Sequence, residues 1–162
     1  MEKPFWRTRP GRTLTAAGPG ASVVRAFLVL AERFDGEARS SVRWLAENTG
    51  VPLREQPAES AAGYRVYRGS GLFAEARVTA ELRAPRQPSA AAPLLLILGL
   101  TERPPLGISL AGQYGPPDTS EPPSPHGPPD APEYSGFRRG NVLASIGVSG
   151  GRVVNLVLQV PG

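Results

Sequence analysis

The sequence predicts an α+β fold, in which one or two N-terminal helices pack on an antiparallel sheet of four to six strands with a C-terminal β-hairpin. Three observations lead to this prediction. Apolar residues recur at helical spacing between residues 21 and 48. Several later segments alternate apolar and polar residues with the period of a strand. Residues 141–160 place a glycine-rich turn between two such segments.

Two helices are expected first. Ala21–Phe34 places its apolar residues on one face, which predicts a helix, although the valine pair at 23–24 leaves a strand as the alternative. A second helix is expected from Glu37 or Ser40 to Asn48, with Gly50 as its stop. The inner face of this second helix would consist of Val42, Leu45 and Ala46.

The segment "GYRVYRGSGLFAEARVTAELRAP" predicts strands separated by a turn. Tyr64–Tyr67 is typical of a strand, and "RGSG" is typical of a turn. Residues 74–83 alternate strictly between apolar and polar, which indicates a strand, whereas their residue types favour a helix. We give the alternation precedence and expect residues 72–84 to form a strand, with a helix as the alternative.

Two apolar segments follow, separated by a short turn. "APLLLILGL", residues 92–100, predicts a strand buried on both faces because no polar residue marks an outer side. "LGISLAGQY", residues 106–114, predicts another short strand. Residues 116–133 hold eight prolines, so this segment is expected to be an exposed proline-rich loop insertion.

The C-terminal segment "NVLASIGV-SGG-RVVNLVLQV" predicts a hairpin whose register depends on the length of its loop. A three-residue loop at 149–151 would place Ile146 opposite Val154 and Ala144 opposite Leu156 on one face. A two-residue Gly-Gly loop would mix polar and apolar residues on both faces. The three-residue loop is therefore the prediction.

Composition sets limits on organisation and partners. Residues 1–20 are predicted to be a flexible basic arm, and residues 21–162 a single α+β domain. The formal net charge of +4 favours acidic partners, although the cations are almost all arginine, as a GC-rich genome would also produce. No apolar run is long enough for a membrane span. A cytoplasmic location is expected, with secretion left open.

The residues needed for catalysis are scarce. There is no cysteine, which excludes disulfides, thiolate metal ligands and a cysteine nucleophile. The single histidine, His126, falls in the proline-rich insertion, where rigid placement is not expected. "GISLAG" departs from the G-x-S-x-G elbow of serine hydrolases, since its second glycine comes one position late. No catalytic residue, cofactor or metal site is predicted.

The stretch "SVRWLAENTGVPLREQP" begins like the first helix and turn of a helix-turn-helix motif. With "GYRVY", the fragment "TGVPLR" resembles pieces of MerR-type regulators, and this resemblance implies a winged-helix DNA-binding fold. The arginine–tyrosine-rich segment between the two pieces is missing. Gln56 and Glu59 stand where a recognition helix needs apolar residues, and Pro57 would interrupt that helix.

Two functions are therefore considered. The first is a non-catalytic protein-interaction or assembly module that uses a sheet face or edge and binds another protein or a second copy. The alternative is a nucleic-acid-binding transcriptional regulator with a degenerate helix-turn-helix or winged-helix element. Its nucleic-acid contacts would come from Arg7, Arg9, Arg12, Arg39, Arg43, Arg65 and Arg68.

Overall fold

A computed structural model describes residues 18–34, 42–86 and 93–160. The described residues form one eight-stranded antiparallel sheet with the strand order β1-β2-β3-β4-β8-β7-β6-β5. The predicted α+β class and the C-terminal hairpin are confirmed, and the sheet has more strands than the expected four to six. The strands are β1 (Arg54–Glu55), β2 (Tyr64–Phe73), β3 (Ala76–Pro85), β4 (Leu94–Leu100), β5 (Thr119–Glu121), β6 (Glu133–Arg139), β7 (Val142–Ser149) and β8 (Arg152–Val160).

Both predicted N-terminal helices are present. Helix α2 (Pro19–Phe34) begins two residues earlier than expected, because a proline ring is compatible with the first helical turn. Helix α3 (Val42–Thr49) ends at Gly50, whose N–H donates to the carbonyl of Ala46 at 3.0 Å. The expected starts of this second helix, at residues 37 or 40, lie outside the described residues.

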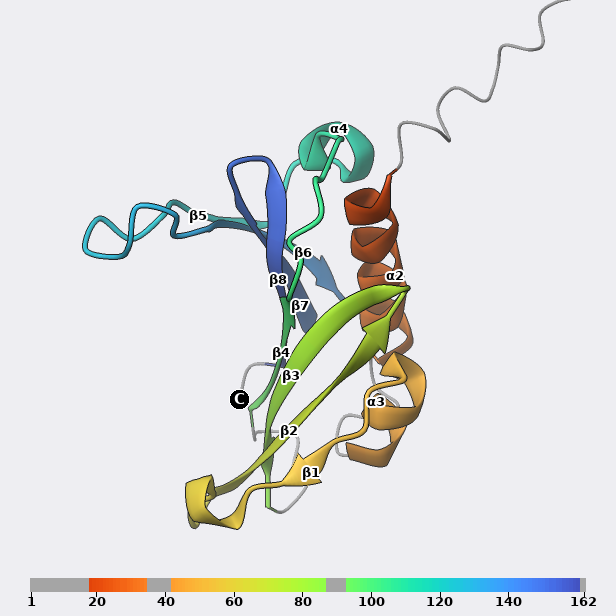
Figure 1. Cartoon of the computed structure of the whole chain (residues 1–162), viewed down its shortest axis with the longest axis vertical. Helices are drawn as coiled ribbons and strands as arrows, with labels where there is room; N and C mark the ends of the chain where they lie inside the picture. Colours follow the sequence, from red (N-terminus) through yellow and green to blue (C-terminus); the bar gives the residue numbers. More distant parts are fainter. Residues whose placement is uncertain (1–17, 35–41, 87–92, 161–162) are drawn as a thin grey trace, which may run out of the picture.

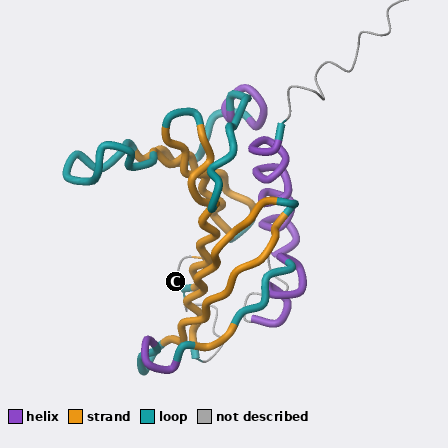
Figure 2. The backbone as a smooth tube through the Cα atoms, in the orientation of Figure 1, coloured by secondary structure: helices purple, strands orange, loops and turns teal. Residues whose placement is uncertain are grey.

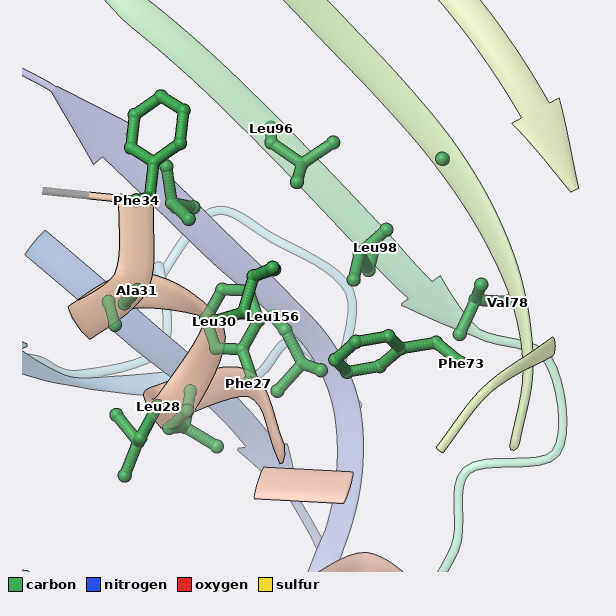
Figure 3. Close-up of a cluster of buried hydrophobic side chains, with 14 of the residues drawn as sticks. Phe27, Leu28, Leu30, Ala31, Phe34, Phe73, Val78, Leu96, Leu98 and Leu156 are labelled. Carbon is green, nitrogen blue, oxygen red and sulfur yellow. The ribbon is translucent and has the colours of Figure 1, made fainter. Parts of the chain in front are cut away.

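Helices α2 and α3 lie on the same side of the sheet (Figure 1; Figure 2). The core fills the space between this side of the sheet and the helices. Figure 3 shows Phe27 and Leu30 of α2 pointing toward Leu96 and Leu98 of β4 and Leu156 of β8. All five side chains are buried, so the predicted apolar face of α2 is the face that packs on the sheet.

The β2–β3 hairpin confirms a strand rather than a helix for most of residues 72–84, although residues 74–75 form the turn of the hairpin. The predicted turn at "RGSG" is wrong, because these residues lie inside β2 and the chain reverses at Ala74–Glu75. Both turn residues have positive φ values, 49° and 69°, as a two-residue hairpin turn requires. The glycines of "RGSG" instead allow the Val51–Pro52 backbone to approach β2 closely.

Strand β4 is buried on one face rather than on both. Its buried residues are Leu94, Leu96, Leu98 and Leu100. The intervening residues, Leu95, Ile97 and Gly99, are half-buried and point to the other side of the sheet. The expectation of a strand covered on both faces is therefore wrong, because the described helices cover only one side.

Residues 106–114 do not form the expected strand. Helix α4 (Leu110–Tyr114) is present there, and the Ser109 hydroxyl caps it by accepting a hydrogen bond from the Gly112 N–H at 3.0 Å. The strand count is instead raised by β6, which the sequence did not predict, and by the short strands β1 and β5. Between β5 and β6, the proline-rich loop projects away from the rest of the molecule (Figure 1).

The C-terminal hairpin has a different register from the predicted one. Its turn is Gly150–Gly151, both with positive φ, so that Ser149 pairs with Arg152. Ile146 consequently faces Leu156, not Val154. A bulge between Gly147 and Val148 absorbs one extra residue, which restores the apolar face beyond the turn. The separation of apolar and polar residues onto opposite faces, which favoured the three-residue loop, is thus achieved with a two-residue turn and a bulge.

Candidate functional site: the uncovered face of the sheet

The side of the sheet opposite α2 and α3 carries no described helix across its centre (Figure 2). Four half-buried apolar side chains point to this side from three adjacent strands, and we call them the apolar stripe. None of the four belongs to the core cluster between the sheet and the helices. The apolar stripe consists of Leu95 and Ile97 on β4, Val157 on β8 and Leu143 on β7.

The strand register brings the members of the apolar stripe together. Ile97 lies directly opposite Val157 across the β4–β8 pair. Leu95 and Leu143 both lie opposite Gln159, one on each side of β8. Directly opposite residues such as Ile97 and Val157 have Cβ atoms about 4.5–5.5 Å apart, whereas Leu95 and Leu143 are diagonal neighbours of Val157 at about 7–8 Å, with the exposed Gln159 between them.

A hollow lies on each side of the Ile97–Val157 pair. The hollow on the β3 side has a volume of about 390 Å³, and Ile97, Gly99 and Arg68 contribute to its lining. The hollow on the β6 side has a volume of about 250 Å³, and Val157 and Glu121 contribute to its lining. The face is therefore a ridge between two concavities, which can accept side chains from a partner.

Asn155 links the two halves of this face. Its Nδ2 donates to the Tyr134 hydroxyl at 3.0 Å, while its Oδ1 is buried with no hydrogen-bond partner among the described residues. The Asn155 side chain lies above Gly147, where any Cβ would overlap it. An unpaired buried acceptor costs about 1–3 kcal/mol. A polar group is thus retained on this face at a cost to stability.

Paired charges border the hollow on the β3 side. Arg68 lies 2.7 Å from Glu59 and 3.2 Å from Glu81, and Arg83 lies 2.8 Å from the same Glu81. Two cations and two anions therefore form one surface network with no net charge. Surface networks of this kind add little stability, but they fix the positions of their side chains.

The Glu59–Arg68 pair predicts a measurable titration. The hydrogen bond from Arg68 holds the pKa of Glu59 below its ordinary value of 4.5. The depressed pKa means that the contribution to stability is present above the unfolded-state pKa and is lost as the pH falls through the folded-state pKa. Carboxyl NMR titration should show Glu59 returning to its ordinary pKa in Arg68→Met, with a smaller change in Arg83→Met. Unchanged titration in Arg68→Met would contradict the pairing.

Of the seven arginines expected to contact nucleic acid, the structure describes three, and these three do not share one face. Arg7, Arg9, Arg12 and Arg39 lie outside the described residues. Arg43 is exposed on α3, with its Nε 3.0 Å from Glu47, and Arg65 lies 3.8 Å from Glu55. Because Arg65 and Arg68 are three residues apart on one strand, they point to opposite faces of the sheet.

The chain after α3 does not continue into a long helix within the described residues. It enters β1 and then a three-residue 3₁₀ helix, η2 (Pro57–Glu59). His126 is exposed in the proline-rich loop. Across residues 18–34, 42–86 and 93–160, no three His, Cys, Asp or Glu side chains are grouped so that they could hold a metal ion.

Among the described helices, none combines the length and apolar character needed to cross a membrane. No protein-family model, curated protein or solved structure matches this chain.

Proposed function

We propose that this chain is a non-catalytic assembly module whose uncovered sheet face packs against a second copy. The observation that carries the proposal is the apolar stripe, which lies between two hollows on a face whose centre no described helix covers. Contiguous apolar side chains rimmed by polar residues are typical of protein-interaction surfaces. Sheet faces pack on each other about 10 Å apart, with interdigitating side chains.

The face is a better contact surface than either edge of the sheet. The outermost strands are β1, with two residues, and β5, with three. Short edge strands present few unpaired backbone groups and so give little scope for strand addition. The open face is therefore the larger contact surface of the described sheet.

A second copy fits this face because each copy supplies both the β3 side and the β6 side of the face. A two-fold axis running along the strands near β4 and β8 would place the β3 side of one copy over the β6 side of the other. The hollow lined by Arg68 and Arg103 would then face the hollow lined by Glu121. Ile97 and Val157 of both copies would form an apolar centre, bordered by the neutral network of Arg68, Arg83, Glu59 and Glu81.

The test is the effect of Ile97→Asp on self-association, measured by size-exclusion chromatography with light scattering and by analytical ultracentrifugation. The wild-type chain is expected to dimerise, and the variant to dimerise at least about tenfold more weakly, because a carboxylate would be buried at the interface centre. The matched control is Val29→Asp, which also replaces a β-branched apolar residue with aspartate but lies on the helical side of the molecule. This variant should leave the dimer intact.

Two results would contradict the proposal. One is a wild-type chain that stays monomeric up to about 1 mM, where an association free energy of roughly −4 kcal/mol already populates a dimer. The other is an Ile97→Asp variant that associates as the wild type does. Circular dichroism and thermal melting of both variants would verify that any change comes from the interface rather than from unfolding.

A further inference from the structure

The helical side of the molecule carries a second surface feature, a groove between α2, α3 and the tip of the β2–β3 hairpin. Its volume is about 440 Å³. Leu30 and Phe73 contribute an apolar floor, and Val29 stands at the rim with 46% of its surface exposed. The groove lies on the opposite side of the molecule from the apolar stripe, so the inference drawn from it does not rest on the proposed assembly function.

The rim of the groove follows one side of α2. Arg25, Val29 and Arg33 are spaced four residues apart, which places them in a row on the helix surface. At 1.5 Å per residue, the two arginine Cα atoms are about 12 Å apart along the helix axis. The Arg33 guanidinium lies 5.9 Å from the ring centroid of Trp44, a cation–π distance that helps to hold it at the end of the row.

The charge of the groove has one sign. The described residues that line it include the cations Arg25 and Arg33 and no carboxylate. The acidic residue nearest in sequence, Glu32, pairs instead with Arg139 at 3.4 Å. Within the described residues, Arg25 forms no ion pair. The groove therefore offers two cations at the rim and apolar side chains between and beneath them.

We propose that this groove binds an acidic amphipathic helical segment of another protein. An apolar anchor would enter beside Val29, over Leu30 and Phe73, while carboxylates on either side of the anchor pair with Arg25 and Arg33. A helical ligand lying along α2 can match the four-residue spacing of Arg25, Val29 and Arg33, because its anchor and its carboxylates can also be placed four residues apart. A phosphate backbone would use the arginines but leave the exposed apolar rim and floor without a partner.

The binding test uses fluorescence anisotropy with a labelled synthetic helical peptide that carries leucines on one face and flanking glutamates four residues away. Affinity is expected at roughly 10–100 µM, and it should weaken with added salt because the rim pairs are exposed. A peptide with the same leucines and with lysines in place of the glutamates should bind at least about tenfold more weakly. A duplex DNA is the third probe.

Variants locate the site. Arg25→Glu/Arg33→Glu should weaken binding of the acidic peptide at least about tenfold, and Val29→Asp should do the same through its added negative charge. The control Arg54→Glu/Arg138→Glu changes the net charge equally at exposed positions outside the groove and should bind as the wild type does. Ile97→Asp should also bind normally, which separates this inference from the assembly proposal.

Four outcomes would overturn the inference. They are absence of binding by the acidic peptide, equal binding of the lysine peptide, equal loss in the Arg54/Arg138 control, and DNA binding that depends on Arg25 and Arg33 and excludes the peptide. The last outcome would assign the groove to nucleic acid instead. Circular dichroism of each variant would show that the helices remain folded.

Discussion

Replacing Phe27 with alanine is expected to lower the free energy of unfolding by about 3–5 kcal/mol. Phe27 is fully buried between α2 and the sheet, where it faces Leu98 and Leu156 (Figure 3). These neighbours stand on hydrogen-bonded central strands, so the cavity cannot close without distorting the sheet. Chemical denaturation followed by circular dichroism would measure the loss as a lower transition midpoint at a constant slope.

The matched control for this prediction is Val29→Ala, two residues further along the same helix. Val29 is 46% exposed, so its truncation removes little buried surface and is expected to change stability by less than about 0.5 kcal/mol. A similar loss for the two variants would show that α2 does not pack through the face described. The comparison holds helix propensity nearly constant, because both substitutions introduce alanine into the helix interior.

The helices could be predicted because their evidence is local. The apolar residues of Ala21–Phe34 recur at the helical period, and the same residues form the core face in the structure. Alternation predicts a strand at residues 72–84 against the residue types, and it was the better guide for β3, although residues 74–75 form a turn. Burial against α2 and the neighbouring strands outweighs a weak intrinsic preference of alanine, glutamate and arginine for helix.

The candidate site could not be predicted because the strand that carries it shows no alternation. Every residue of "LLLILGL" other than glycine is apolar, so the sequence does not distinguish its core face from its open face. The absence of a second helical layer is what leaves Leu95 and Ile97 half-buried. One available indication was the rarity of helical segments, since two helices can cover only one side of a wide sheet.

The register of the C-terminal hairpin illustrates a different limit. From Leu143 to Ile146 the faces were assigned correctly, because the true register there differs from the predicted one by two residues and strand faces repeat every two. Val154 was assigned to the wrong face: the bulge places Val153 in the core, and Val154 lines the hollow on the open face. The pairing partners were wrong, since a bulge beside Val148 is not encoded in any simple pattern. As a result Asn155 pairs with Gly147 rather than Ser145, which places its amide near Tyr134 in the candidate site.

Strand β6 was missed for lack of apolar residues. In "EYSGFRR" only Gly136 and Phe137 are buried, so the sequence shows neither the 3.6-residue period of a helix nor the two-residue period of a strand. Its position is set by pairing with β7 on one side and β5 on the other. Such a strand is specified by its neighbours and not by its own composition, and the hollow lined by Tyr134 was missed with it.

Replacing Gly69 with valine is expected to lower the free energy of unfolding by about 3 kcal/mol, although valine is among the best strand formers. A Cβ at position 69 would overlap the carbonyl group of Pro52, which belongs to the segment joining α3 to β1. Backbone cannot rotate aside as a flexible side chain can. Relief therefore requires the Val51–Pro52 segment to lift from the sheet, which would expose the buried Val51.

Gly63→Val is the control, because Gly63 has open space around its Cβ position and stands just before the same strand. It is expected to leave stability unchanged within about 0.5 kcal/mol or to raise it slightly, since it restricts the unfolded chain. Denaturation of both variants would distinguish two explanations for the glycines in "RGSG". Equal, small effects would indicate a tolerant turn-like segment, whereas a loss confined to Gly69→Val would show that the glycine is needed for close approach of the chain after α3.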